Sequence, residues 1–226
     1  MTAHKPLLPV IAVLGGTGKE GPGLAMRWAH AGYKVLIGSR QAEKAQTTAD
    51  ELNLKLGITS VEGLQNDEAA RRADISVLTV VFSAHESAVE SLKPALQGKI
   101  LVDATARVDF REPRPPAPPS APVLAQQILG EAVRVVGAFQ TVPSHVLKKN
   151  LGESLDTDVL VCTDDLDAAE QVIRLAQAGG MNAYYAGPLE NAIVVEGLAA
   201  VMISLNKHYG VRTASISVSG VPPQAD

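Results

Sequence analysis

Residues 10–21 read Val10-Ile-Ala-Val-Leu-Gly-Gly-Thr-Gly-Lys-Glu-Gly21, and this stretch determines the fold class that we predict. Its first five residues are all apolar, as in a parallel strand that is buried on both faces. The glycines end this strand, and residues 24–31 then carry apolar side chains at helical spacing. The stretch therefore predicts a strand, a tight turn and a helix in immediate succession.

The turn contains the pattern G-x-G-x-x-G, formed by Gly16, Thr17, Gly18, Lys19, Glu20 and Gly21. Between a strand and a helix, this pattern is typical of a loop that holds a dinucleotide pyrophosphate. Gly16 allows the tight turn, Gly18 lets the backbone approach the phosphates, and Gly21 lets the helix pack close to the strand. The free N–H groups of the first helical turn then face the anion. The alternative is a glycine-rich turn without a ligand.

The end of the second predicted strand indicates which dinucleotide is bound. Enzymes that use NAD usually carry an acidic residue here, which holds the ribose 2′-hydroxyl. This chain instead has Ser39 and Arg40, with Lys44 one helical turn further on. A hydroxyl, a guanidinium and an ammonium suit a 2′-phosphate, which predicts NADP. The alternative is a solvated helix start with ordinary surface charges.

Apolar runs and helical patterns alternate along the first 140 residues. Strands are expected at 10–14, 34–38, 57–61, 74–81, 99–103 and 133–139, and helices at 24–31, 42–52, 67–72, 87–96 and 123–129. Such alternation predicts an α/β fold, a Rossmann-type doubly wound parallel sheet with right-handed crossovers.

The rest of the chain predicts a small C-terminal α/β extension. After Pro143 we expect a helix, a strand at 159–162, a helix at 166–178, a strand near 183–185 and a long helix from about 189 to 208. We divide the chain into a nucleotide-binding domain, residues 1–142, and a domain that completes the second-substrate site, residues 143–226. The segment 111–122 contains six prolines and is expected to be a surface loop, or alternatively an interdomain linker.

Composition limits the partners and the location. The 226 residues carry a net charge of −4 and one cysteine, Cys162, so we expect no nucleic-acid partner and no disulfide within the chain. We see no signal peptide and no apolar run approaching the roughly 18 residues of a membrane span, and we expect a cytoplasmic protein. The long last helix is apolar nearly all round, which predicts a homodimer, with burial inside one chain as the alternative.

A second substrate should meet the nicotinamide where strands four, five and six end, at residues 79–82, 103–107 and 139–144. His85 and His145 are candidates for acid–base work, but we interpret them as loop or helix-cap residues. Asp103 is interpreted as structural, and Lys148-Lys149 as a solvated helix face or a contact for an anionic tail. The sequence has neither a Tyr-x-x-x-Lys pair nor metal-ligand spacing, so we assign no catalytic residue and no metal.

Several segments together resemble the NADPH-dependent F420 reductases. They are Ile11 to Gly18, Gly38-Ser-Arg40, Glu43-Lys44, Ala73-Asp74, Val77-Leu-Thr79, Ala138 to Pro143 and Ala186-Gly-Pro-Leu189. The resemblance implies hydride exchange between NADP(H) and coenzyme F420, a 5-deazaflavin with a charged tail. It implies that Thr17 to Glu20 line the NADP site and that Ser39, Arg40 and Lys44 hold the 2′-phosphate. It places the nicotinamide near Val80, Ala106 and Ser144.

Two features depart from that family. Gln140 stands where some members have a histidine, and the proline-rich segment 111–122 is unusual.

Two other functions stay open at this point. One is an NADP-dependent reductase of a small carbonyl or imine, which should show a proton donor. The other is a non-catalytic NADP sensor, which would need a partner surface in place of a second pocket.

Overall fold

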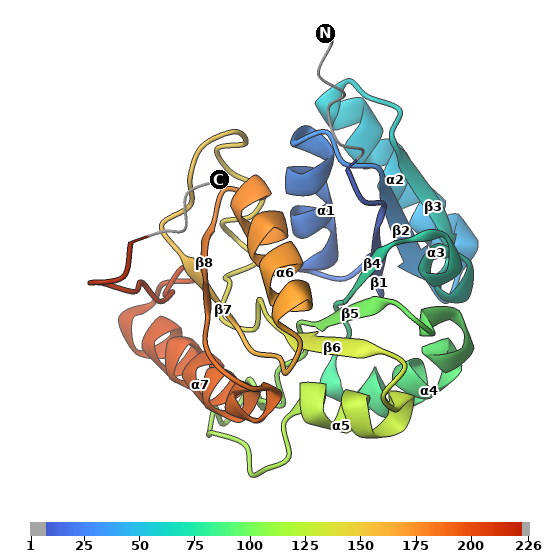
Figure 1. The fold of residues 1–226 in the computed structure, drawn as a ribbon. Coiled ribbons are helices and arrows are strands. Elements are labelled where there is room, and N and C mark those ends of the chain that lie inside the picture. The colour runs from blue at the N-terminus through green and yellow to red at the C-terminus, as the bar shows by residue number, and fades with distance from the viewer. Residues whose placement is uncertain (1–7, 223–226) are drawn as a thin grey trace, which may run out of the picture.

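The structure is a computed structural model that describes residues 8–222. Its centre is a six-stranded sheet in the order β3-β2-β1-β4-β5-β6, with every neighbouring pair parallel (Figure 1). The strands are Ile11–Leu14, Val35–Ser39, Val61–Gln65, Ile75–Leu78, Ile100–Asp103 and Arg134–Gly137, β1 to β6 in turn. This strand order confirms the predicted Rossmann-type sheet, in which strands are added outward in one direction from β1 to β3 and in the other from β4 to β6.

Side chains of β1 alternate between two hydrophobic layers. Ile11 and Val13 face α1 and α2, whereas Ala12 and Leu14 face α3 and α4. Residues that point to opposite faces of a fully buried strand must all be apolar, which explains the uninterrupted apolar run. The covering helices are α1 (Gly21–His30), α2 (Ala42–Leu56), α3 (Asn66–Arg72), α4 (His85–Leu96) and α5 (Ala121–Leu129).

The C-terminal part forms a second, two-stranded parallel sheet. It consists of β7 (Asp158–Val161) and β8 (Asn182–Tyr185), with α6 (Leu166–Ala178) between them. Gly137 and Cys162 form an antiparallel bridge that joins the end of this sheet to β6. After β8 come a short 3-10 turn, η2 (Leu189–Asn191), and α7 (Ala192–Tyr209), and the segment after α7 returns to β7, where the Asp158 N–H donates to the Ile216 carbonyl at 3.0 Å.

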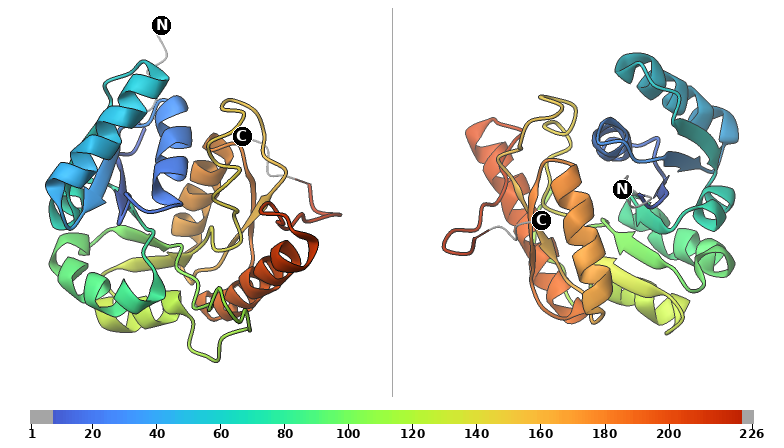
Figure 2. Two further views of the ribbon diagram at one scale, coloured as in Figure 1. Left: turned by 180° about the vertical axis from the view of Figure 1, so that it is seen from behind. Right: turned by 45° about the horizontal axis from the view of Figure 1, so that its top comes forward.

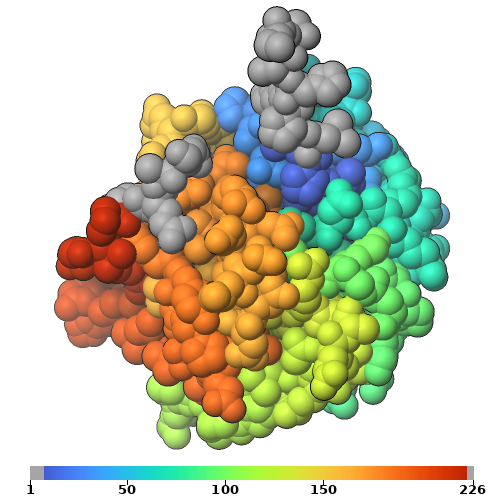
Figure 3. Space-filling model, viewed as in Figure 1, coloured from blue at the N-terminus to red at the C-terminus, as the bar shows by residue number. Residues whose placement is uncertain are grey.

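α6 packs beside α1, so one hydrophobic layer continues from the N-terminal sheet into the C-terminal part (Figures 1 and 2). Trp28 of α1 lies at this junction. Its ring meets the Phe139 ring edge-on at 5.8 Å, and its Nε1 donates to the Leu175 carbonyl at 2.9 Å. In the space-filling view, the orange atoms of the C-terminal part, which include α6, lie directly against atoms of the N-terminal half (Figure 3).

Two predicted elements are wrong. The third strand is not at 57–61 but at Val61–Gln65, because Gly57 has a φ of +66° and ends α2. The helix expected directly after Pro143 is not formed: residues 144–153 make turns and bends. Carbonyls of this segment that would accept helical hydrogen bonds are instead bound by Arg27. Its Nε donates to Leu147 and its Nη2 to Lys149, at 2.9 and 2.5 Å.

Other boundaries shift by a few residues. α5 begins at Ala121 rather than at 123, because the Ser120 hydroxyl caps it by accepting from the Val123 N–H at 3.3 Å. β4 ends at Leu78 rather than at 81. The proline-rich segment runs outside the sheet, along α7: a Cβ at Gly197 would lie 3.6 Å from Pro115.

The expectation that no apolar run approaches the length of a membrane span is wrong. The segment Leu189–Tyr209 is long and apolar enough by length and composition alone, with a mean hydropathy of 1.4. In the structure this helix packs against α5 and contains the fully buried Glu196. Its outer side exposes Val194, Val201, Leu205 and Tyr209, so α7 is not covered on all sides within one chain.

Candidate functional site

The glycine loop after β1 is shaped by close backbone packing. The Gly16 N–H donates to the Gly38 carbonyl at 2.9 Å, which joins the loop to the end of β2. A Cβ at Gly16 would lie 2.5 Å from the Val13 carbonyl oxygen, and one at Gly21 would lie 2.6 Å from the Gly16 Cα. Neither position has room for a side chain. At Gly18, by contrast, the nearest atom to a Cβ is 3.6 Å away and the residue is exposed.

These differences fit a pyrophosphate site. Gly16 and Gly21 let the loop and α1 pack tightly, and Gly18 presents bare backbone to the outside. Among residues 8–222, no group accepts a hydrogen bond from the backbone N–H of Thr17, Lys19 or Glu20. Because α1 begins at Gly21, these donors lie at the positive end of its dipole.

The end of β2 carries the residues predicted for a 2′-phosphate. Ser39 is the last residue of the strand and is 7% exposed, and its hydroxyl accepts from the Gln41 N–H at 3.2 Å. Arg40 and Lys44 are exposed, and neither forms an ion pair with any residue that the structure describes. Two solvent-facing cations therefore stand beside the glycine loop, ready to pair with an anion.

The segments after β4 and β5 form the neighbouring part of this edge. A Cβ at Gly15 would lie 2.6 Å from Val80 Cγ1, so the Val80 side chain sits directly against the glycine loop. The Thr105 hydroxyl lies 3.4 Å from the Val80 carbonyl and holds the residue before Ala106 to the β4 segment. Val81 and Phe82 follow with 66% and 42% of their surfaces exposed. The edge thus offers apolar surface next to the glycine loop.

Ser144 comes from the third segment, after β6. This segment covers the start of α1, because a Cβ at Gly23 would lie 2.6 Å from the Leu147 Cβ. Ser144 is half-buried in the turn, and His145 beside it is exposed. The predicted residues Val80, Ala106 and Ser144 therefore all follow strands of one sheet edge, as the sequence suggested.

A buried pair ties these three segments together. His85 Nε2 lies 2.6 Å from Asp103 Oδ2, and both side chains are inaccessible to solvent. Asp103 Oδ1 accepts from the Thr105 N–H at 3.0 Å, and its carbonyl accepts from Gln140 Nε2 at 3.0 Å. Complete burial keeps His85 away from any substrate in this conformation, which supports a structural interpretation of the pair.

Sequence reasoning missed a second cluster at this edge. The Arg107 guanidinium lies 5.4 Å from the centre of the Phe82 ring, and its Nε lies 3.3 Å from Glu196 Oε2. The other Glu196 oxygen accepts from the Ala121 N–H at 2.6 Å. Burial raises the pKa of Glu196, although Ala121 and Arg107 act in the opposite direction. No local signal pointed to Glu196, because it lies in an apolar helix 89 residues from Arg107.

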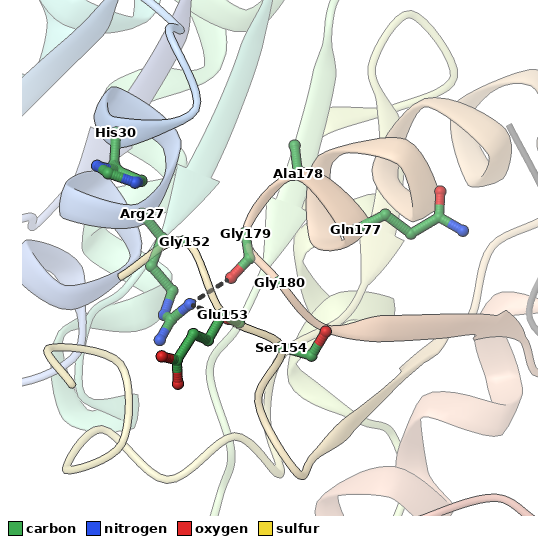
Figure 4. A pocket seen from close by; sticks show the side chains of 9 residues that line it. All are labelled: Arg27, His30, Gly152, Glu153, Ser154, Gln177, Ala178, Gly179 and Gly180. Atoms are coloured by element: carbon green, nitrogen blue, oxygen red, sulfur yellow. Dashed lines mark hydrogen bonds between the residues drawn. The ribbon is translucent and has the colours of Figure 1, made fainter. Parts of the chain in front are cut away.

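Two cavities lie along α1. One, of about 380 Å³, adjoins the glycine loop and is lined by Thr17, Gly18, Pro22, Met26, Thr48, Glu51, Leu52, Lys55 and Lys148. The other, of about 220 Å³, lies at the far end of α1 around Arg27 (Figure 4). There the Arg27 guanidinium donates to the Gly179 carbonyl at 2.9 Å as well as to the turn at 144–153. These hydrogen bonds to backbone carbonyls give Arg27, which lines the second cavity, a structural role.

Among residues 8–222, no group of three or more His, Cys, Asp or Glu side chains is placed to hold a metal ion. The candidate site combines the glycine loop, the cations Arg40 and Lys44, which have no ionic partner among the described residues, and an apolar strand edge.

Comparisons with known proteins agree with this geometry. A family model described as NADP oxidoreductase, coenzyme F420-dependent, matches residues 10–107. The F420-dependent NADP reductase of Methanothermobacter thermautotrophicus is 36% identical, and the match covers 97% of this chain and 99% of that protein. The chain belongs to the F420-dependent NADP reductase family. The family member from Methanocaldococcus jannaschii is also 36% identical, over 93% of this chain and 98% of its own.

The family relationship includes the C-terminal part of the fold. A crystal structure of a proposed F420-dependent NADP reductase from Arthrobacter sp. FB24 superposes with a TM-score of 0.76 at 26% identity. It covers 92% of this chain and 98% of that one. The superposition therefore extends over most of the C-terminal part of this chain as well as the N-terminal sheet.

Proposed function

We propose that this chain transfers a hydride between NADP(H) and the 5-deazaflavin coenzyme F420. The observation that carries the proposal is the glycine loop with its free N–H groups beside Arg40 and Lys44, in a chain that belongs to the F420-dependent NADP reductases over almost its full length. NADP(H) and F420 supply the redox chemistry when bound, and the protein orients them.

The dinucleotide is held by its phosphates. The backbone from Gly16 to Gly21, including Thr17, Gly18, Lys19 and Glu20, binds the pyrophosphate at the positive end of α1. Ser39, Arg40 and Lys44 bind the 2′-phosphate, which distinguishes NADP from NAD. The structure is compatible with this arrangement, because the bare backbone of Gly18 is open and both cations lack an ionic partner among the described residues.

The reacting rings meet at the apolar edge. Val80, Ala106 and Ser144 contact the nicotinamide, and the exposed Val81 and Phe82 offer a flat surface for the second ring. Correct stacking of two bound reactants lowers the barrier by up to about 7–11 kcal/mol in favourable cases. No side-chain acid or base is assigned: the hydride passes directly from ring to ring, and the one proton that reduction of the deazaflavin also takes up comes from solvent.

The two other functions considered from the sequence are less well supported. Similarity over almost the full chain to F420-dependent NADP reductases does not favour a reductase of small carbonyls or imines. Solved pyrroline carboxylate and imine reductases share the fold at 16–17% identity, which carries no information about substrate. A sensor would need no apolar edge beside its phosphate loop.

We further propose a cytoplasmic homodimer with α7 in its interface. α7 exposes Val194, Val201, Leu205 and Tyr209, and contiguous exposed apolar surface marks interaction sites. Residues 1–142 would supply the NADP site and residues 143–226 would complete the second-substrate site. A light-scattering mass of one chain at micromolar concentration would contradict the dimer.

Mixing the protein with NADPH and F420 tests the proposed function. We expect the visible absorption of the deazaflavin to bleach in proportion to NADPH consumed. Free flavins and small carbonyl compounds serve as alternative acceptors under the same conditions. NADPH oxidation with a carbonyl but not with F420 would overturn the proposal in favour of the first alternative, and no oxidation with any acceptor would favour the sensor.

A further inference from the structure

We propose that Glu20 takes part in dinucleotide binding as an uncharged carboxylic acid, so that NADP(H) binding is coupled to a proton on Glu20. The inference rests on the proposed function, because it concerns the same glycine loop. Its starting point is an orphaned atom: Glu20 Oε1 is buried and has no hydrogen-bond partner among residues 8–222.

The backbone of Glu20 is fixed in place. Its carbonyl accepts from the Gly23 and Leu24 N–H groups at 2.9 and 3.2 Å, which are the first hydrogen bonds of α1. Its side chain makes no capping hydrogen bond to the helix. Glu20 is therefore a partly buried residue of the glycine loop whose Oε1 has no structural partner among the described residues.

Burial makes the ionised form of this carboxyl costly. It raises the pKa of Glu20 from 4.5 to about 8, and burial is the only cause. The titratable and charged side chains of the loop, of α1, α2 and α3, and of the neighbouring positions 40 and 148 are Lys19, Arg27, His30, Arg40, Glu43, Lys44, Asp50, Glu51, Lys55, Asp67, Glu68, Arg71, Arg72 and Lys148. None of them shifts the pKa of Glu20, so no neighbouring charge compensates for a carboxylate at this point.

A bound dinucleotide would further favour the protonated form of Glu20 over the carboxylate. Its pyrophosphate would bring negative charge to the same helix terminus, and a like charge nearby disfavours a carboxylate. The protonated acid also has an O–H donor, which the ionised form lacks. Ionisation of Glu20 therefore introduces repulsion and removes a donor, and both effects weaken the complex.

The expected size of the effect follows from linkage. If only the protonated form binds and its pKa is about 8, the apparent Kd for NADPH rises about tenfold between pH 7 and pH 9. Binding then takes up about half a proton per NADPH at pH 8 and about a tenth of a proton at pH 7. Above pH 7 the 2′-phosphate, with a second pKa of about 6, contributes little to this dependence.

Isothermal titration of NADPH into the full-length protein between pH 7 and pH 9 tests the proposal. Titrations at pH 8 in two buffers of different ionisation enthalpy give the proton uptake directly, without any variant. The Glu20→Gln variant mimics the neutral acid and cannot ionise, so the test is whether its affinity for NADPH still changes with pH. Its Kd should stay constant up to pH 9. Circular dichroism at each pH shows whether the proteins stay folded.

Glu43→Gln is the matched control, because Glu43 is an exposed acid in the first turn of α2 and should leave the pH dependence unchanged. A parent Kd that is flat from pH 7 to pH 9, no proton uptake at pH 8, or a Glu20→Gln variant that keeps the pH dependence would each overturn the proposal. Failure of NADPH to bind at any pH would instead contradict the proposed function itself.

Discussion

Replacing Arg40 by alanine should reduce the preference for NADPH over NADH. Arg40 is exposed at the end of β2 and has no ionic partner among the residues that the structure describes, so its removal leaves no buried charge uncompensated. A hydrogen bond to a charged group contributes about 1.5–3 kcal/mol. For a solvent-facing pair we take the lower end, and about 1.4 kcal/mol corresponds to a tenfold change in Kd.

We therefore expect Arg40→Ala to raise the Kd for NADPH about tenfold and to leave the Kd for NADH within about twofold, since NADH has no 2′-phosphate. Quenching of protein fluorescence or titration calorimetry at constant ionic strength measures both constants. Arg174→Ala is the matched control, because Arg174 is an exposed arginine on α6 with its own partner, Glu170. Equal losses for NADPH and NADH, or no loss for either, would refute the assignment of Arg40.

Four further results are expected. Gly21→Ala should weaken NADPH binding and lower the free energy of unfolding by about 1–3 kcal/mol in urea titrations, because its Cβ would lie 2.6 Å from backbone; unchanged binding would be inconsistent with the tight loop. Ser144→Trp should abolish turnover while NADPH still binds, and retained turnover would remove Ser144 from the ring site. His145→Ala should lower kcat less than tenfold, whereas a general acid or base contributes about 10²–10⁴-fold. Burial raises the pKa of Glu20 to about 8, so the folded protein loses stability as pH rises from about 4.5 to about 8. Glu20→Gln should therefore raise the free energy of unfolding above that of the parent at pH 9 and change it little at pH 4. The same difference from the parent at both pH values would count against a buried carboxyl at position 20.

The parts of the molecule that sequence reasoning predicted are those fixed by local chemistry. The run from Ile11 to Leu14 is buried on both faces, and Gly16 and Gly21 have no space for a side chain. Ser39, Arg40 and Lys44 lie within six positions of one another in the sequence. Once the end of β2 is assigned, their common location at the sheet edge follows. The apolar periodicity and the glycine spacing of the sequence are enough to predict the strand, the turn and the end of β2.

The parts that were missed depend on contacts between distant residues. The turn at 144–153 is not helical because Arg27, about 120 residues earlier, binds its carbonyls. Glu196 lies in an apolar helix, and only the fold brings it to Arg107 and Ala121. Sequence patterns contain no record of such partners. For the same reason, the apolar composition of α7 could not tell a buried helix from one with an uncovered face.

Direct hydride transfer is the central claim, and isotope labelling tests it. NADPH deuterated at one C4 position is mixed with excess protein and F420 for a single turnover, and both products are analysed by mass spectrometry. If the two rings stack at the strand edge in one orientation, one stereoisomer of labelled NADPH should deliver its deuterium to the deazaflavin, and the other should keep it in NADP. Loss of deuterium to water from either isomer, or equal transfer from both, would contradict this account.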